Sequence, residues 1–469
     1  MPDRIEAFIE AVAAEIRWKK ARPVLTEEIR THLLDQRDAY AAQGMTEDAA
    51  QAEAVRQMGD PVALGTDLDR IHRPRPQWGL LALALALTAA GVFLRYSLTA
   101  DMPAISLGDR QMDLLGGLIG AGALAVGYLL DVSFLSRRAW WTCAALAAVF
   151  LCFLPWKANS AAWMSAQMLA LFPLTLALVL WKQRGKRWRG AAVCLGWTAL
   201  AAAACCLCPS VYALMLVTMA GLVLGLFFAL RDWLGLGRKK SVLLVLALGL
   251  GVLAVIVAAR WEYLRYSLFA DLGPTNQGYF AFILREALAG ARWIGPAELP
   301  AWATEQGLTF RQVVPEMDSD ALLVNLICTW GWLPFLALVG VFLAFFLWLL
   351  WKTLHLRQTL GRAVCLAAVT ALAVQALASL TLTLGVPVLA GGFPLVVSNT
   401  NTVLDLFLIG LALSALRNGS LPERAPAPCR KGSVFLRRIR WENGELILSL
   451  GPRQEQGATV ADFECVWCQ

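Results

Sequence analysis

The stretch VVPEMDSDALLVNLICTWGW, residues 313–332, decides how the chain is read, because acidic residues stand directly before a long apolar run. Glu316, Asp318 and Asp320 lie close together, and the apolar run continues to about residue 350. A charged side chain inside a bilayer is costly. The stretch therefore predicts that a membrane helix begins here and that its first turn carries an unusual load of negative charge.

The composition supports a membrane protein. The chain has 469 residues, of which 58% are hydrophobic and 16% are charged, whereas a soluble domain has about 25% charged residues. The net charge of +7 does not indicate a nucleic-acid partner, because the basic residues lie in short loops between apolar runs, where they set membrane orientation. The eleven cysteines fall mostly in apolar runs, so neither a disulfide framework nor a metal site is expected.

The apolar runs predict about ten transmembrane helices in an all-α polytopic fold, since a span needs roughly 20 apolar residues. The expected spans are 78–96, 112–132, 139–156, 162–181, 191–208, 210–230, 241–259, 321–350, 360–383 and 394–416. Loops on one side are rich in Lys and Arg, whereas the opposite short loops hold only Arg95, Arg110 and Lys157. The basic loops predict that both termini are cytoplasmic and that residues 260–319 form a large outer loop.

Three regions follow from this division. Residues 1–75 are expected to form a cytoplasmic helical unit, with Ile5, Phe8, Ile9, Val12 and Ile16 on one helix face and Val62, Leu64, Leu68 and Ile71 facing inward on another helix. Residues 76–416 form the membrane domain. In the cytoplasmic tail, 417–469, alternation around Asn443-Gly444 indicates a β-hairpin.

The predicted outer loop contains residues suited to phosphate binding. A segment from Gly278 is expected to be an interfacial helix, with Phe282, Ile283, Leu288 and Trp293 at headgroup depth. The loop arginines are Arg260, Arg265, Arg285, Arg292 and Arg311. Arginine grips phosphate bidentately. The alternative is that these arginines pair with loop acids such as Glu286 and Glu298.

Asp320 has two interpretations. Ser319 or Asp320 could cap the following helix, because exposed N–H groups and the helix dipole favour a carboxylate at a helix N-terminus. A single cap does not account for three acids at a membrane face. The functional interpretation is a carboxylate general base that takes a proton from a sugar hydroxyl attacking a lipid-linked donor.

Several segments, in order, resemble the SEDS family (shape, elongation, division and sporulation) of FtsW/RodA/SpoVE-like membrane proteins. PEMDSDALLVNLICTWGW resembles that family's Pro-Glu-x-His-Thr-Asp-Phe stretch, with Asp320 on its Asp and Asp318-Ser319 in place of its His-Thr. GPTNQGYF keeps Pro274, Gly278 and Tyr279 of a second motif. LCPSVYALMLV keeps Pro209, and TLGVPVLAGGFPLVVSNTN keeps Gly385, Pro387 and Ser398. The resemblance covers about residues 78–416, and residues 1–75 resemble a permease-prefix domain.

The resemblance implies peptidoglycan glycosyltransfer in a bacterial cell membrane, in division, elongation or sporulation. The substrate would be lipid II, and a class B penicillin-binding protein would be the cross-linking partner. Asp320 would be the catalytic base. Outer-loop arginines, with Tyr279 and Ser398, would bind substrate, and a divalent cation (Mg²⁺ or Mn²⁺) could assist the pyrophosphate leaving group.

Two alternatives remain open. The chain could be a non-catalytic membrane scaffold or regulator of cell-wall synthesis, in which case Asp320 would be dispensable. It could instead be a flippase for a lipid-linked precursor, which would need polar groups at mid-bilayer depth. Gln375 and Asp405 are the clearest such residues in the spans, and Asp131 lies near an end of its span.

Overall fold

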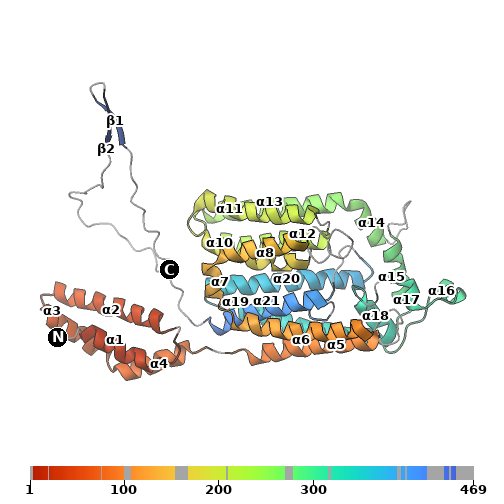
Figure 1. Ribbon diagram of the computed structural model, residues 1–469, viewed down its shortest axis with the longest axis horizontal. Helices are drawn as coiled ribbons and strands as arrows, with labels where there is room; N and C mark the ends of the chain where they lie inside the picture. Colours follow the sequence, from red (N-terminus) through yellow and green to blue (C-terminus); the bar gives the residue numbers. More distant parts are fainter. Residues whose placement is uncertain are drawn as a thin grey trace. The chain divides into compact units, whose positions relative to one another are not determined.

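The computed structural model describes residues 4–19, 21–74, 76–99, 107–153, 167–207, 210–269, 278–314, 317, 319–387, 392–396, 399–419, 438–442 and 445–449. Apart from one pair of short strands, the described regular elements are helices (Figure 1). The predicted all-α polytopic fold is therefore confirmed. By compactness, the chain divides into a unit Met1–Leu421 and a unit Pro422–Gln469.

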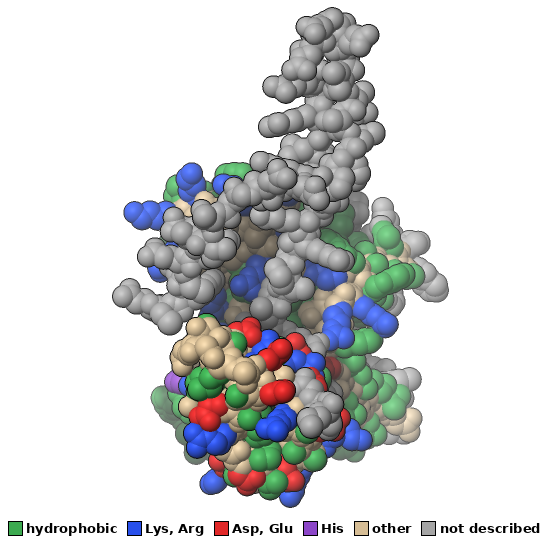
Figure 2. All heavy atoms as spheres, turned by 90° about the vertical axis from the view of Figure 1, so that its left-hand side faces the viewer, with side chains coloured by type: hydrophobic (Ala, Val, Ile, Leu, Met, Phe, Trp, Pro, Cys, Tyr) green, Lys and Arg blue, Asp and Glu red, His purple; other side chains and the backbone are tan. Residues whose placement is uncertain are grey.

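The first four helices pack around an apolar core of their own. They are α1 (Arg4–Glu15), α2 (Arg22–Ala42), α3 (Glu47–Met58) and α4 (Pro61–His72). Ile5, Phe8, Ile9, Val12 and Ile16 are all buried, as their spacing predicts. The Asp60 side chain caps α4 by accepting from the backbone N–H of Val62 and Ala63. The prediction for α4 was half wrong: Leu64 and Leu68 pack on the core, but Val62 and Ile71 are exposed. Figure 2 shows acidic and basic side chains intermingled on this unit.

Each of the ten predicted spans contains a described helix, and these helices run side by side as a bundle (Figure 1). The helices are α5 (Trp78–Leu98), α6 (Leu107–Leu129), α8 (Ala139–Phe153), α10 (Phe172–Lys182), α11 (Arg187–Leu207), α12 (Val211–Ala229), α13 (Arg238–Ala259), α18 (Leu322–Trp330) with α19 (Trp332–Leu354), α20 (Thr359–Thr383) and α21 (Asn399–Arg417). Among the described residues, six helices are long and apolar enough to cross a membrane. The short helix α7 (Val132–Arg137) and a 3₁₀ turn, η1 (Leu169–Leu171), join neighbouring helices.

Helix α20 lies at the centre of the bundle, and 83% of its apolar window is buried inside the protein. Helix α13, in contrast, has almost no buried side chain, as expected for a helix that faces lipid. Helices α6 and α21 approach so closely that a Cβ on Gly127 would meet the Phe407 carbonyl oxygen at 2.5 Å, and a Cβ on Gly410 would meet the Leu124 oxygen at 2.4 Å. Small residues permit this contact, as is common between membrane helices.

The span expected at 321–350 is two helices rather than one, because the chain breaks at Gly331. This glycine has φ 100° and ψ −179° and separates α18 from α19. The backbone groups released by the break bond to the preceding loop: Trp332 N–H donates to the Arg292 carbonyl at 3.0 Å, and Leu333 N–H donates to the Trp293 carbonyl at 3.0 Å. The break therefore holds Arg292 and Trp293 against the start of α19, while the Gly295 N–H donates to the Trp330 carbonyl of α18 at 3.0 Å.

The region predicted as an outer loop is largely helical. It contains α14 (Trp261–Phe269), α15 (Tyr279–Ala289), α16 (Ala301–Glu305) and α17 (Phe310–Val313), which gather with α18 at one end of the bundle (Figure 1). We call this end the capped end. Helix α15 was expected to lie in the lipid interface, but its Ile283 and Leu284 are fully buried against Val324 and Leu382. Trp293, at 70% exposure, is free to occupy the interface.

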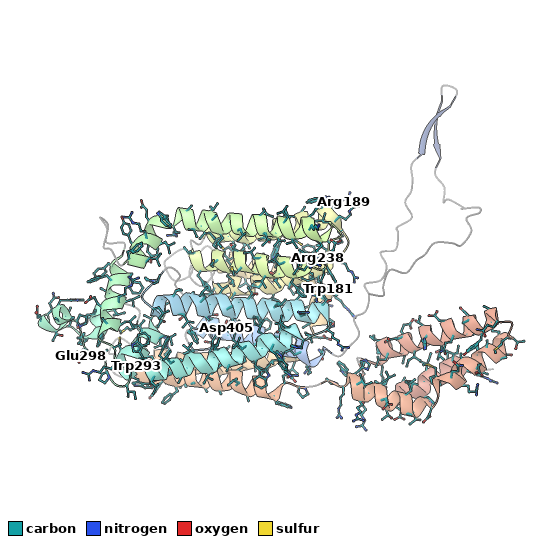
Figure 3. The ribbon with its side chains drawn as sticks, turned by 180° about the vertical axis from the view of Figure 1, so that it is seen from behind. Trp181, Arg189, Arg238, Trp293, Glu298 and Asp405 are labelled. Carbon is teal, nitrogen blue, oxygen red and sulfur yellow. The ribbon has the colours of Figure 1, made fainter. Side chains whose placement is uncertain are left out.

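The opposite end of the bundle is basic. Its loops and helix ends carry Arg137, Arg138, Lys182, Arg184, Lys186, Arg187, Arg189, Arg231, Arg238, Lys239, Lys240, Lys352, Arg357 and Arg362. Figure 3 shows Arg189 and Arg238 at this end, near Trp181, and Trp293 and Glu298 at the capped end. The Arg184 guanidinium lies 4.6 Å from the centre of the Trp233 ring, and that ring packs on Trp181.

In the last unit, β1 (Arg438–Glu442) pairs with β2 (Glu445–Ser449) in antiparallel register, with Glu442 opposite Glu445. These strands lie on either side of the predicted turn, and residues 443 and 444 themselves lie outside the described residues.

Candidate active site at the capped end of the bundle

Asp320 lies at the capped end, immediately before α18, and is partly buried. Ala321 occupies the N-cap position of α18 and makes no side-chain cap bond, so neither Ser319 nor Asp320 is the N-cap residue that the sequence suggested. The neighbouring Met317 and Ala321 are buried in the apolar cluster beneath α15 and α17. Asp320 therefore stands at the edge of an apolar layer, while Glu316 and Asp318 lie outside the described residues.

A buried carboxamide holds this segment in place. Asn325, on α18, donates from Nδ2 to the Met317 carbonyl at 3.3 Å and to the Leu98 carbonyl of α5 at 3.5 Å. Its Oδ1 accepts from the Thr329 hydroxyl at 3.0 Å. Because these contacts join α18, α5 and the turn before Asp320, Asn325 fixes where the Asp320 backbone emerges.

Tyr212 links Asp320 electrostatically to a second carboxylate. This tyrosine begins α12, is buried, and lies within electrostatic range of both Asp320 and Asp405. Asp405, on α21, is only 1% exposed, and Figure 3 shows it inside the bundle. Its Oδ2 accepts from the Leu395 N–H at 3.4 Å. The capped end thus holds one carboxylate near the surface and one deep between helices.

Asp405 lies among buried polar side chains. The Gln375 carboxamide, on α20, approaches the Asp405 carboxylate, although its Nε2 makes no well-directed hydrogen bond with a described residue. Asn401 is one helical turn before Asp405, and Ser379 is one turn after Gln375. The Asn401 carboxamide and the Ser379 hydroxyl are buried without a described hydrogen-bond partner. Each such group costs about 1–3 kcal/mol.

Arg285 is engaged in structure rather than open to a ligand. Its Nε donates to the Gly385 carbonyl at 3.0 Å, and its Nη2 donates to the carbonyls of Ser267 at 2.8 Å and Leu268 at 2.7 Å. One guanidinium thus joins α15 to the ends of α14 and α20. These bonds use Nε and Nη2 and give Arg285 a structural role, and substrate binding by this residue stays a prediction.

The other predicted arginines divide into three cases. Arg292 forms an exposed ion pair with Glu298, which is the alternative that the sequence left open. Arg260, at the end of α13, and Arg265, on α14, are exposed, and the Arg265 guanidinium lies 5.2 Å from the centre of the Tyr266 ring. The backbone of Arg311 lies in α17, and its side chain is outside the described residues.

The predicted motif residues are only partly visible at this end. Tyr279 begins α15 and is 52% exposed. The Pro387 carbonyl accepts a hydrogen bond from the Tyr263 hydroxyl at 2.9 Å. Ser398, Pro274 and Pro209 lie outside the described residues. The structure therefore places Asp320 at the capped end and Asp405 inside the bundle, and Ser398 stays a prediction.

The suggested divalent cation finds no ready site among the described residues, which contain no group of three or more His, Cys, Asp or Glu side chains close enough to share an ion. The divalent cation therefore stays a prediction.

No family model matches the sequence, and no curated protein matches it. Solved structures do match the fold. A chain from a peptidoglycan synthase complex that coordinates polymerization and crosslinking superposes with a TM-score of 0.51 and 19% identity, covering 73% of this chain and 98% of that one. A mutant of the rod shape determining protein RodA from Thermus thermophilus gives a TM-score of 0.49 and 16% identity, covering 73% of this chain and 97% of that one. The first of these matches shows that the described helices share the fold of that chain.

Proposed function

We propose that this chain, which has the SEDS fold, is a peptidoglycan glycosyltransferase that polymerises lipid II at the outer face of a bacterial cytoplasmic membrane. The observation that carries the proposal is the position of Asp320. It is a partly buried acid at the capped end of the bundle, on the Asp of the family's motif. The fold match to a peptidoglycan synthase complex supports the substrate class.

In the proposed reaction, the Asp320 carboxylate accepts the proton of an acceptor sugar hydroxyl. The hydroxyl oxygen attacks the anomeric carbon of the donor, the bond to the pyrophosphate breaks, and the lipid pyrophosphate leaves with its electron pair. The configuration at the anomeric carbon is inverted. The apolar layer of Met317 and Ala321 beside Asp320 keeps water from competing with the sugar hydroxyl.

Charge builds on the pyrophosphate as it leaves, and exposed guanidinium groups can stabilise it. Arg260 and Arg265 are exposed and form no ion pair with a described residue, which supports this role for them. Arg285 is bonded to three carbonyl oxygens, and Arg292 is paired with Glu298. We therefore assign leaving-group contacts to Arg260 and Arg265 first, with Tyr279 as a further exposed contact. We also propose a class B penicillin-binding protein as the cross-linking partner.

The experiment is polymerisation of purified lipid II by the purified chain, alone and with candidate transpeptidases. Asp320→Asn removes the base while preserving shape, and general-base loss costs about 10²–10⁴-fold in rate. Glu305→Gln is the matched control, because Glu305 is an exposed acid on α16 at the same end. If Asp320→Asn polymerises as fast as the parent chain, the enzymatic proposal fails, and a scaffold role takes its place.

One observation favours a second candidate function, movement of a lipid-linked precursor across the membrane. Such a transporter needs polar groups deep in the bundle, and Asp405, Gln375 and Asn401 provide them. Transfer of labelled lipid II between leaflets of proteoliposomes, unaffected by Asp320→Asn, would support this reading over polymerisation.

A further inference from the structure

Two polar stripes face each other inside an otherwise apolar bundle. Gln375 and Ser379 are four residues apart on α20, and Asn401 and Asp405 are four residues apart on α21. Residues at this spacing share a helix face. Helices α20 and α21 pack together, and Gln375 approaches Asp405 across their interface. All four side chains are at most 3% exposed.

The cluster lacks partners that a folded protein normally supplies. Both atoms of the Asn401 carboxamide, Ser379 Oγ and Gln375 Nε2 are buried without a described hydrogen-bond partner. No Lys or Arg among the described residues pairs with Asp405. A proton on Asp405 would neutralise the charge of its carboxylate. Asn401 and Ser379 would still lack a described hydrogen-bond partner. One small bound ion would serve the carboxylate and its neighbours together.

We propose that this cluster is a binding site for one small monovalent cation, of which sodium is the representative. The ligands are oxygens: the Asp405 carboxylate, the Asn401 and Gln375 carboxamides and the Ser379 hydroxyl, with the Tyr212 hydroxyl nearby. Hard cations prefer this donor set. A monovalent ion balances the single carboxylate, whereas a divalent ion would leave a net charge in the bundle. Asn401 can turn its oxygen toward the ion without losing a hydrogen bond to a described residue.

The backbone beside the cluster supports this assignment. Between α20 and α21 the described chain at 392–396 is not helical, and the buried Leu395 has φ 65°. A non-glycine residue in the left-handed region is strained and persists where the surroundings hold it. Here the Leu395 N–H bonds to Asp405 Oδ2. In many transporters, non-helical backbone between two helix segments lines the site of a small cation. The inference does not depend on the proposed polymerase activity.

The test is binding of ²²Na⁺ to the purified chain of residues 1–469 in detergent, together with the melting temperature of the chain in sodium chloride and in choline chloride at equal ionic strength. We expect one ion per chain, and a melting temperature higher by about 3 °C at saturating sodium.

Asp405→Asn, which preserves shape and removes the charge, should abolish both effects. Asn401→Ala should weaken sodium binding at least about tenfold. Asp131→Asn is the control, because Asp131 caps α7 elsewhere in the chain, and it should leave sodium binding unchanged.

Several results would overturn the assignment. The cluster would hold water alone if the parent chain bound no ²²Na⁺ and melted equally in both salts. The site would be elsewhere if Asp405→Asn still bound sodium. A divalent site would be indicated if Mg²⁺, but not Na⁺, raised the melting temperature of the parent chain and left that of Asp405→Asn unchanged.

Discussion

At the scale of the residue, a substitution of Arg285 can distinguish a structural role of this arginine from a role in substrate binding. Lysine keeps the charge but cannot hold three carbonyl oxygens with a planar fork. We expect Arg285→Lys to destabilise the protein by about 1–3 kcal/mol and to leave the KM for lipid II unchanged. Melting curves and polymerisation kinetics measure the two quantities. Arg265→Lys is the control for stability, because Arg265 is exposed. An unchanged melting temperature with a raised KM would return Arg285 to the substrate site.

Single residues also show where sequence reasoning stops. Asp320 could be found because a motif and a hydropathy boundary coincide at its position. Tyr212 could not, because a tyrosine at the start of an apolar run looks like any interfacial aromatic until helix packing brings it near two acids. Gln375 and Asp405 were visible as polar residues in apolar runs, but their meeting with Asn401 and Ser379 depends on how α20 and α21 are rotated. Hydropathy does not specify that rotation.

At the scale of the element, the break between α18 and α19 is the feature most open to test. A Cβ on Gly331 would lie 2.7 Å from the Trp293 carbonyl oxygen and 2.8 Å from that of Arg292, and its φ of 100° disfavours alanine. We expect Gly331→Ala to destabilise the protein by about 2 kcal/mol or more, measured by thermal unfolding. Gly340→Ala is the matched control inside α19, where a Cβ meets nothing within 4 Å, and it should be neutral or stabilising. Equal melting temperatures for both variants would contradict the strain argument.

The elements also mark what hydropathy could and could not predict. Runs of apolar residues located a helix in every expected span because burial in lipid requires length and little else. The apolar runs gave no sign of the break at Gly331, because a glycine between two tryptophans does not interrupt the apolar run. They also misassigned Ile283 to the lipid interface, because an apolar face packed on protein and one packed on lipid have the same composition.

At the scale of the whole molecule, the charges separate the two ends of the bundle. The short loops of the basic end are rich in Lys and Arg, whereas the arginines of the capped end, among them Arg260, Arg265 and Arg292, share it with acids such as Asp320, Glu298 and Glu305. Cytoplasmic loops of membrane proteins are enriched in Lys and Arg. We therefore propose that the capped end is the outer one, which is where the proposed chemistry needs its substrate. Without that orientation Asp320 could not reach a lipid-linked sugar on the outer leaflet.

Orientation is tested by cysteine labelling in whole cells with a membrane-impermeant maleimide. We expect Glu305→Cys, on the exposed face of α16, to be labelled from outside, and Arg189→Cys, at the basic end, to be labelled only after the membrane is opened. Because the parent chain already contains cysteines, its labelling is measured first. Only labelling of a variant above that of the parent chain is attributed to the introduced cysteine. Six described free cysteines belong to membrane helices, where a charged reagent reacts slowly. Labelling of Arg189→Cys in intact cells would invert the topology, and since Asp320 and Glu305 share one end, it would place the proposed base on the side opposite its substrate.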